Sequence, residues 1–226
     1  FSKGITGMGF APTCLPILAL TMGLEVALVL VPSVASNIIV QIEVGYFRDS
    51  MRRFWPLIVA GMIGVGIGLA LLTWMETRLA AAVLGGVLIV YGLFALKTPN
   101  LTMPARLEKP LAPVTGLATG IVNGLTGSQL MPVLPYLMAL NLDRERFVQA
   151  INCSFTSSSI VMAIGLSKIG LMNIETALVS AIGVIPVWIG LKLGGNIRRR
   201  LAPELFRKLV IYMLMSSGVL LLIRAM

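Results

Sequence analysis

The sequence predicts an all-α polytopic membrane protein built from two inverted repeats. Each repeat is expected to open with a broken helix or a re-entrant helical hairpin, followed by three transmembrane helices. Three observations predict this fold class: an apolar composition, a series of apolar stretches long enough to cross a membrane, and a glycine-rich motif that occurs twice along the chain. The repeated motif also predicts where a binding site lies.

The composition of the chain is typical of a membrane protein. Of its 226 residues, 57% are hydrophobic and 12% are charged, and the mean hydropathy is +0.94. Soluble domains carry about 25% charged residues. A transmembrane helix needs about 20 predominantly apolar residues. The stretches near this length are 26–46, 54–75, 79–96, 144–166, 173–196 and 205–224.

Two further apolar stretches, 1–22 and 112–140, are interrupted by closely similar motifs. The first motif reads KGITGMGFAPTCLP from residue 3, and the second reads NGLTGSQLMPVLP from residue 123. Their shared glycine, threonine and proline residues are offset by 120 positions. Paired interruptions of apolar segments are the best sequence indication of a transporter's binding site.

The duplication divides the chain into repeat one (1–96), a linker (97–111) and repeat two (112–226). In repeat two, about ten residues precede the motif and form its first half-helix. Repeat one has no such residues before Phe1, so we expect its first half-helix to be missing from this sequence.

The positions of the basic residues favour hairpins over full crossings. If 112–140 enters the membrane and returns, the connectors at 47–53, 97–111, 141–146 and 197–208 all lie in the cytoplasm. These connectors hold most of the arginine and lysine, and basic connectors stay on the cytoplasmic side. A full crossing would instead place Arg198–Arg200 outside. The sequence alone does not separate a re-entrant hairpin from a broken helix that crosses fully.

Each hairpin predicts a half-helix that starts inside the membrane, where its free N–H groups and its dipole favour an anion. We expect these starts near Gly7–Gly9 and near Gly127–Gln129. The lysine of the first motif would add a positive charge to the pocket. Polar stripes on 26–46 and 144–166 would form its walls. The predicted substrate-binding residues are Lys3, Thr6, Gly7, Gly9, Asn37, Asn123, Thr126, Gly127, Ser128, Gln129, Asn152 and Thr156.

Each of these features also has a purely structural interpretation. The glycines could permit close helix packing, and the hydroxyl and amide side chains could form interhelical hydrogen bonds. Lys3 could lie near the interface and extend its ammonium group to water. The occurrence of two matching copies favours the binding site.

Other function classes find little support. The net charge of +9 is spread over short connectors, so we expect no nucleic-acid partner. The basic run Arg198–Arg200 fits the headgroups of membrane lipid instead. The chain has no histidine, and Cys14 and Cys153 are not equivalent in the repeats. We therefore expect no enzyme activity, no metal site and no cofactor.

The duplicated motif, the proline after each copy and the asparagine-bearing helix that follows resemble the TauE/SafE (TSUP) family of sulfite and organosulfonate transporters. The motif KGITGMG at residues 3–9 is the most specific part of this resemblance. The resemblance implies an exporter of small sulfur-containing anions, such as sulfite, sulfoacetate or other organosulfonates, in the bacterial inner membrane. A homodimer is compatible with it. The alternatives are a passive small-anion channel and a thiol-dependent sulfur-handling membrane protein.

Overall fold

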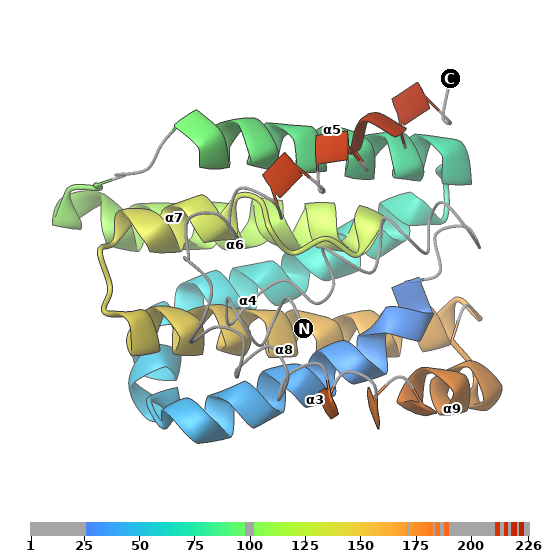
Figure 1. The fold of residues 1–226 in the computed structure, drawn as a ribbon, viewed down its shortest axis with the longest axis horizontal. Coiled ribbons are helices and arrows are strands. Elements are labelled where there is room, and N and C mark those ends of the chain that lie inside the picture. Colours follow the sequence, from blue (N-terminus) through green and yellow to red (C-terminus); the bar gives the residue numbers. More distant parts are fainter. Residues whose placement is uncertain are drawn as a thin grey trace.

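The computed structural model describes residues 26–97, 102–170 and 172–182, with the short helical pieces 184–185, 188–189, 211–212, 215–216, 218–220 and 222–223. Within these residues the secondary structure is entirely helical (Figure 1). The elements are α3 (Val26–Val44), α4 (Phe47–Leu72), α5 (Thr77–Lys97), α6 (Ala105–Thr126), α7 (Val133–Ala139), α8 (Arg144–Lys168) and α9 (Ile174–Ile182).

Helices α6 and α7 form a hairpin. Helix α6 ends at Gly127, which adopts the left-handed conformation (φ 73°) and donates its N–H to the Asn123 carbonyl at 2.7 Å. Glycine adopts this conformation without a steric penalty. The chain then runs back along α6, so that α7 ends beside the start of α6 (Figure 1). A hydrogen bond of 2.9 Å from the Met103 N–H to the Ala139 carbonyl joins these two ends.

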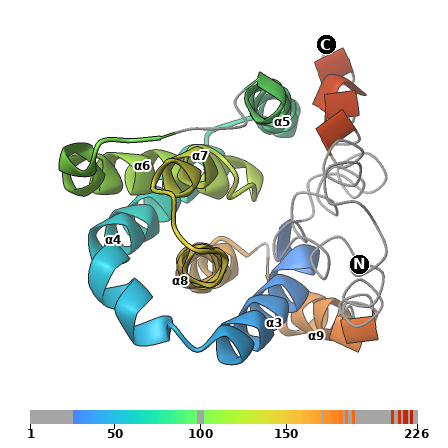
Figure 2. The ribbon, with the colours of Figure 1, turned by 60° about the vertical axis from the view of Figure 1, so that its left-hand side comes forward.

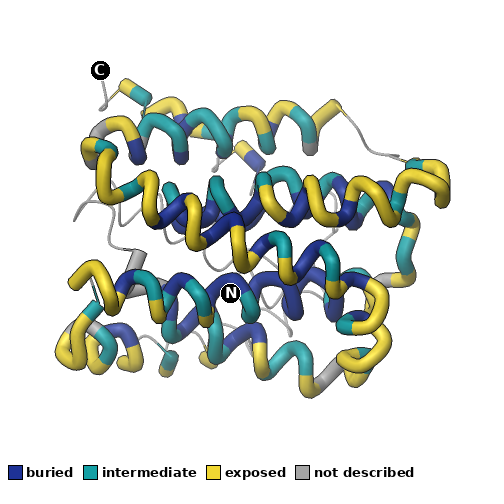
Figure 3. Tube along the Cα trace, turned by 180° about the vertical axis from the view of Figure 1, so that it is seen from behind, coloured by how far each residue is buried: buried dark blue, intermediate teal, exposed yellow. Residues whose placement is uncertain are grey.

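Helix α8 occupies the centre of the described bundle, with α3, α4 and α7 around it (Figure 2). It begins at Asp143, whose carboxylate accepts a hydrogen bond of 2.9 Å from the Arg146 N–H. This is the usual N-capping interaction. Buried residues face the middle of the bundle and exposed residues cover its outer faces (Figure 3).

Helices α4 and α6 pack through glycine. Gly61, Gly64 and Gly68 of α4 face a matching row on α6, formed by Gly116, Gly120 and Gly124. A Cβ atom built on Gly124 would lie 2.6 Å from the Val65 carbonyl oxygen and 2.7 Å from the Gly68 Cα. The two backbones are therefore in direct contact, as is common where helices associate in membranes.

The opposite face of α4 carries large apolar side chains to the outside. Trp55, Val59, Ile63, Ile67 and Leu71 recur every fourth residue and are all exposed. Two described helices are long and apolar enough to cross a membrane, Phe47–Leu72 and Glu145–Lys168. An exposed apolar stripe of this length would be unfavourable in water and suits contact with lipid. Both features are consistent with a helical membrane protein.

The helices correspond to the predicted segments, with two differences in extent. Helix α4 begins at Phe47 rather than at residue 54, and α6 begins at Ala105 rather than at residue 112. The polar and basic residues at both starts are thus helical, because helix propensity does not require an apolar side chain. The opening segment 1–22 of repeat one lies outside the described residues, and the inverted relation of the repeats stays a prediction.

Candidate functional site

The structure places the described site candidates in three groups. Asn123, Thr126, Gly127, Ser128 and Gln129 lie at the end of α6 and in the turn that follows. The other described candidates, Asn37 on α3 and Asn152 and Thr156 on α8, come from neighbouring helices. Lys3, Thr6, Gly7 and Gly9 lie outside the described residues.

The turn corrects one expectation of the sequence analysis. The second half-helix does not start near Gly127–Gln129, because Gly127 terminates α6 and α7 starts at Val133. The Ser128 N–H donates to the Thr126 hydroxyl at 3.2 Å, and that hydroxyl donates to the Val122 carbonyl at 2.7 Å. The backbone amide of Ser128 and the Thr126 side chain therefore stabilise the turn itself.

Two side chains at this turn are buried without a visible partner. Asn123 and Ser128 are 1% and 0% exposed. In the described part of the protein, the Nδ2 and Oδ1 atoms of Asn123 and the Oγ atom of Ser128 make no hydrogen bond. An unsatisfied buried polar group costs about 1–3 kcal/mol. Natural proteins retain such groups for a specific reason, of which ligand binding is one.

Gln129 connects the same turn to α8. Its side-chain amide donates to the Ser159 hydroxyl at 3.1 Å and lies 3.5 Å from the Phe155 carbonyl oxygen. The turn is thus held against the middle of α8, a helix of 25 residues. The unpartnered Asn123 and Ser128 lie within a few residues of this connection.

A neighbouring face of α8 carries a second polar contact, made with α3. Gln41 of α3 donates to the Thr156 hydroxyl at 2.7 Å and lies 3.3 Å from the Asn152 carbonyl oxygen. Asn37, one turn earlier on α3, is 1% exposed. Gln41 lies in the predicted polar stripe of 26–46 but is not among the predicted site residues. Its spacing of four from Asn37 was the available signal.

Helix α8 is therefore polar on several faces at the same level. Thr156 faces α3, Ser159 faces the α6–α7 turn, and Ser158 lies near Gly61 of α4. All three residues lie near the middle of a helix that is long enough to cross a membrane. Polar groups at this depth are costly and mark binding sites or transport pathways in membrane proteins.

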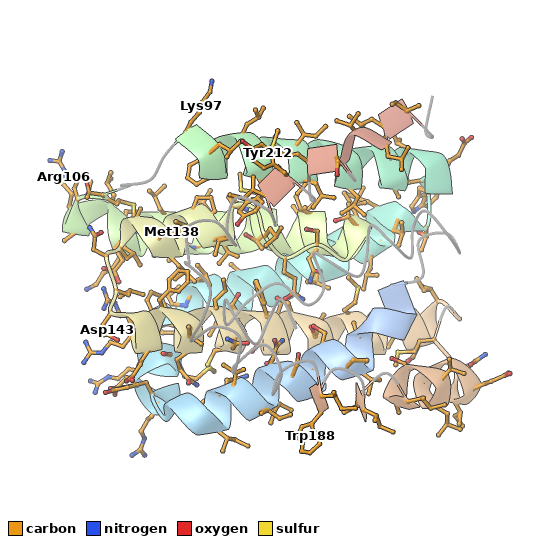
Figure 4. The ribbon with its side chains drawn as sticks, viewed as in Figure 1. Lys97, Arg106, Met138, Asp143, Trp188 and Tyr212 are labelled. Carbon is orange, nitrogen blue, oxygen red and sulfur yellow. The ribbon has the colours of Figure 1, made fainter. Side chains whose placement is uncertain are left out.

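Charged residues from several helices gather at one end of the bundle. Lys97, Arg106 and Asp143, from the ends of α5, α6 and α8, lie at the same end (Figure 4). Arg53 of α4 forms a bidentate ion pair there with Glu108 of α6, at 2.7 and 3.0 Å. The Tyr136 hydroxyl of α7 donates to the Glu108 carbonyl at 2.9 Å. These contacts hold the start of α6 against α4 and α7, at the end of the bundle where the basic connectors lie.

The arrangement offers hydrogen-bond donors rather than metal ligands. Among the described residues, no three histidine, cysteine, aspartate or glutamate side chains gather in a way that could hold a metal ion. The groups near mid-α8 are amides and hydroxyls, which bind oxygen atoms of a ligand by hydrogen bonds.

Comparison with known proteins identifies one family. The family model described as "Sulfite exporter TauE/SafE" matches residues 1–221, almost the whole chain. No curated protein and no solved structure matches the chain. The match includes both copies of the motif and all the helices described above.

Proposed function

Because the chain belongs to the sulfite exporter TauE/SafE family, we propose that it is a secondary transporter that exports small sulfur-containing anions. Sulfite, sulfoacetate and related organosulfonates are the substrates we consider. The family match supports the class of substrate, and the polar groups around mid-α8 support the position of the site.

The observation that carries the proposal is the pair of buried side chains Asn123 and Ser128. Their polar atoms have no hydrogen-bond partner in the described residues, at a turn in the interior of a membrane protein. A sulfite or sulfonate group has several oxygen atoms that accept hydrogen bonds. The amide and the hydroxyl supply donors for them. The amide oxygen of Asn123 can in turn accept a hydrogen bond from a protonated form of the anion.

In this part of the proposed site, side chains bind the anion in place of the free backbone N–H groups that the sequence predicted. The Ser128 N–H is already bonded to Thr126, so the side chains of Asn123 and Ser128 are the groups we assign to the anion, while Gln129 holds the turn against α8. Lys3, Thr6, Gly7 and Gly9 would complete the site from the first motif. In this proposal Lys3 supplies the positive charge that compensates the anion.

The proposed orientation follows from the basic end of the bundle. We place the ends of α3, α5 and α7 in the cytoplasm, because Arg48, Arg53, Lys97, Arg106 and Arg146 lie near them. The α6–α7 hairpin then enters the membrane from the cytoplasm and returns to it. The protein would be a multi-pass protein of the bacterial inner membrane.

Transport into proteoliposomes tests this function. The purified protein is reconstituted, and uptake of labelled sulfite, sulfoacetate and taurine is measured with and without the same anion trapped inside. Saturable uptake that the trapped anion stimulates is expected for a carrier. Uptake without saturation or counterflow would indicate a passive channel. No uptake of any sulfur anion by folded protein would contradict the proposal.

Substitution of Asn123 by Ala separates binding from folding. We expect the KM for sulfite to rise about tenfold, which corresponds to one lost charge-assisted hydrogen bond of about 1.4 kcal/mol. The thermal midpoint in detergent should stay the same or rise, because an unsatisfied buried amide is removed. A fall in thermal midpoint with an unchanged KM would show that Asn123 is a structural residue.

A further inference from the structure

Gln41 of α3 forms hydrogen bonds with the middle of α8. Its Nε2 atom lies 2.7 Å from the Thr156 Oγ1 atom and 3.3 Å from the carbonyl oxygens of Asn37 and Asn152. Its Oε1 atom accepts a hydrogen bond of 3.4 Å from the Cys153 thiol. One side chain of repeat one thus contacts three residues on one side of α8, namely Asn152, Cys153 and Thr156.

The network continues beyond Cys153. The Gln149 amide donates to the Cys153 sulfur at 3.6 Å, so Gln149, Cys153, Gln41 and Thr156 form a chain of hydrogen bonds. A glutamine amide whose oxygen accepts from one group and whose nitrogen donates to another has a defined orientation. The chain therefore fixes which atom of Gln41 faces Thr156.

An open cavity borders this network. It has a volume of about 460 Å³ and is lined by Ile38, Gln41, Ile42, Gly45, Phe47 and Thr156. Gln41 and Thr156 carry the polar side chains of this lining. Because one side of Gln41 faces open space, close packing does not hold its side chain, and the hydrogen bonds determine its position.

We propose that Gln41 is a positioning residue of the anion site. It holds α3 against α8 and orients the Thr156 hydroxyl, which accepts from Gln41 and keeps its own proton free to donate. This inference rests on the proposed function and on the prediction from the sequence that Thr156 is also a binding residue. Gln41 acts through Thr156 and Asn152 and belongs to the opposite repeat, so the geometry of the site depends on how the two repeats meet.

The first test compares transport by two variants of α3. Gln41→Met keeps the length of the side chain and removes every hydrogen bond. Its KM for sulfite should rise roughly fivefold, the effect of one ordinary hydrogen bond, with the maximal rate within about twofold of wild type. Ile39→Val, on the same helix but outside the cavity lining, should leave both values unchanged. An unchanged KM in Gln41→Met would overturn the proposal.

A second variant shows whether Gln41 acts through Thr156. Thr156→Val removes the hydroxyl and keeps the shape of the side chain. If the two residues act as one unit, the double variant Gln41→Met/Thr156→Val should raise the KM no further than Thr156→Val alone. Fully additive effects on the KM would show that Gln41 does not act through Thr156.

Labelling of Cys153 gives a readout that is independent of transport. The protein has two cysteines, so Cys153 is the sole thiol in a Cys14→Ser background. N-ethylmaleimide should label it roughly fivefold faster in Gln41→Met, because the thiol loses its hydrogen bond to Gln41. The thermal midpoint of the variant should stay close to that of Cys14→Ser.

The two readouts separate the two possible failures. If the wild-type protein carries no sulfur anion, the proposed function is wrong, and faster labelling would still show that Gln41 orders the polar face of α8. If the wild-type protein transports sulfite but Gln41→Met changes neither the KM nor the labelling rate, the role of Gln41 alone is wrong.

Discussion

Among the interfaces that join the predicted repeats in the described structure, two differ sharply in the groups that form them. Helices α4 and α6 meet through glycine, with backbone atoms in direct contact at Gly61, Gly64, Gly120 and Gly124. Helices α3 and α8 meet through polar side chains, with Gln41 bonded to Thr156, Cys153 and the Asn152 carbonyl. Each interface pairs one helix of repeat one with one helix of repeat two.

The difference indicates which contact can change during transport. Backbones in van der Waals contact have no side chains to rearrange, so a shift of α4 against α6 would break many contacts at once. Hydrogen-bonded side chains can exchange partners at little cost, because a polar ligand or water can replace either partner. We expect α4 and α6 to move as one unit and the α3–α8 contact to change.

The largest effect is expected from breaking the glycine interface. In Gly120→Val, a side chain would meet the Gly61 carbonyl oxygen and the backbone of Gly64 and Val65. Overpacking against a backbone that cannot yield costs about 1–3 kcal/mol or more. We expect a large fall in thermal midpoint in detergent, or loss of folded protein.

Gly66 offers the matched control for this substitution. It lies on α4 among the same glycines, but a Cβ atom there would meet nothing within 4 Å. Gly66→Ala should keep or slightly raise the thermal midpoint, since alanine favours a helix by about 1 kcal/mol over glycine in water. Equal destabilisation by both substitutions would mean that the close packing of Gly120 against α4 does not explain the effect of Gly120→Val.

A tether across α4 and α6 tests whether this interface moves during transport. Arg53 and Glu108 form an ion pair across the two helices, at 2.7 Å, so cysteines at both positions should react with one short bifunctional maleimide. In a background without Cys14 and Cys153, we expect the tethered protein to retain most of its sulfite uptake. Loss of uptake on tethering, with uptake intact in the untreated double-cysteine variant, would show that the two helices separate during the transport cycle.

The smallest effect is expected at the ion pair itself. Arg53 and Glu108 have side chains that are 42% and 19% exposed, and ion pairs of this kind contribute about 0–1 kcal/mol. Glu108→Gln should therefore lower the thermal midpoint only slightly, and less so at high salt. A loss as large as that of Gly120→Val would mean that the charged end, and not the glycine interface, holds α4 and α6 together.

Much of the local structure was predictable from the sequence. The ends of α3, α5 and α8 lie within a few residues of the predicted apolar stretches, and the interruption after Thr126 is where the glycine-rich motif placed it. Asn123, Ser128 and Gln129 were chosen from the same motif. The predicted helix ends and the interruption are confirmed because hydropathy, glycine and proline act on the chain within one or two helical turns, whereas the binding role of these three residues stays a prediction.

The errors arise where the same residues permit two local structures. A glycine after a hydroxyl residue can begin a helix or end one, and Gly127 ends α6 by adopting the left-handed conformation. Gln41 was not selected because nothing in its own segment indicates that it meets Thr156. Their sequence separation is 115 residues, and only the packing of α3 on α8 brings them together.

The sequence by itself determined that the protein is a helical membrane protein, where its α6 segment is interrupted, and which polar residues lie within its apolar segments. These properties depend on the composition and order of neighbouring residues. The tertiary structure decided that α6 and α7 fold back as a hairpin, that the glycines of α6 meet those of α4, and that Gln41 reaches α8. Such pairings depend on contacts between helices that are far apart in the sequence. No single segment therefore predicts them.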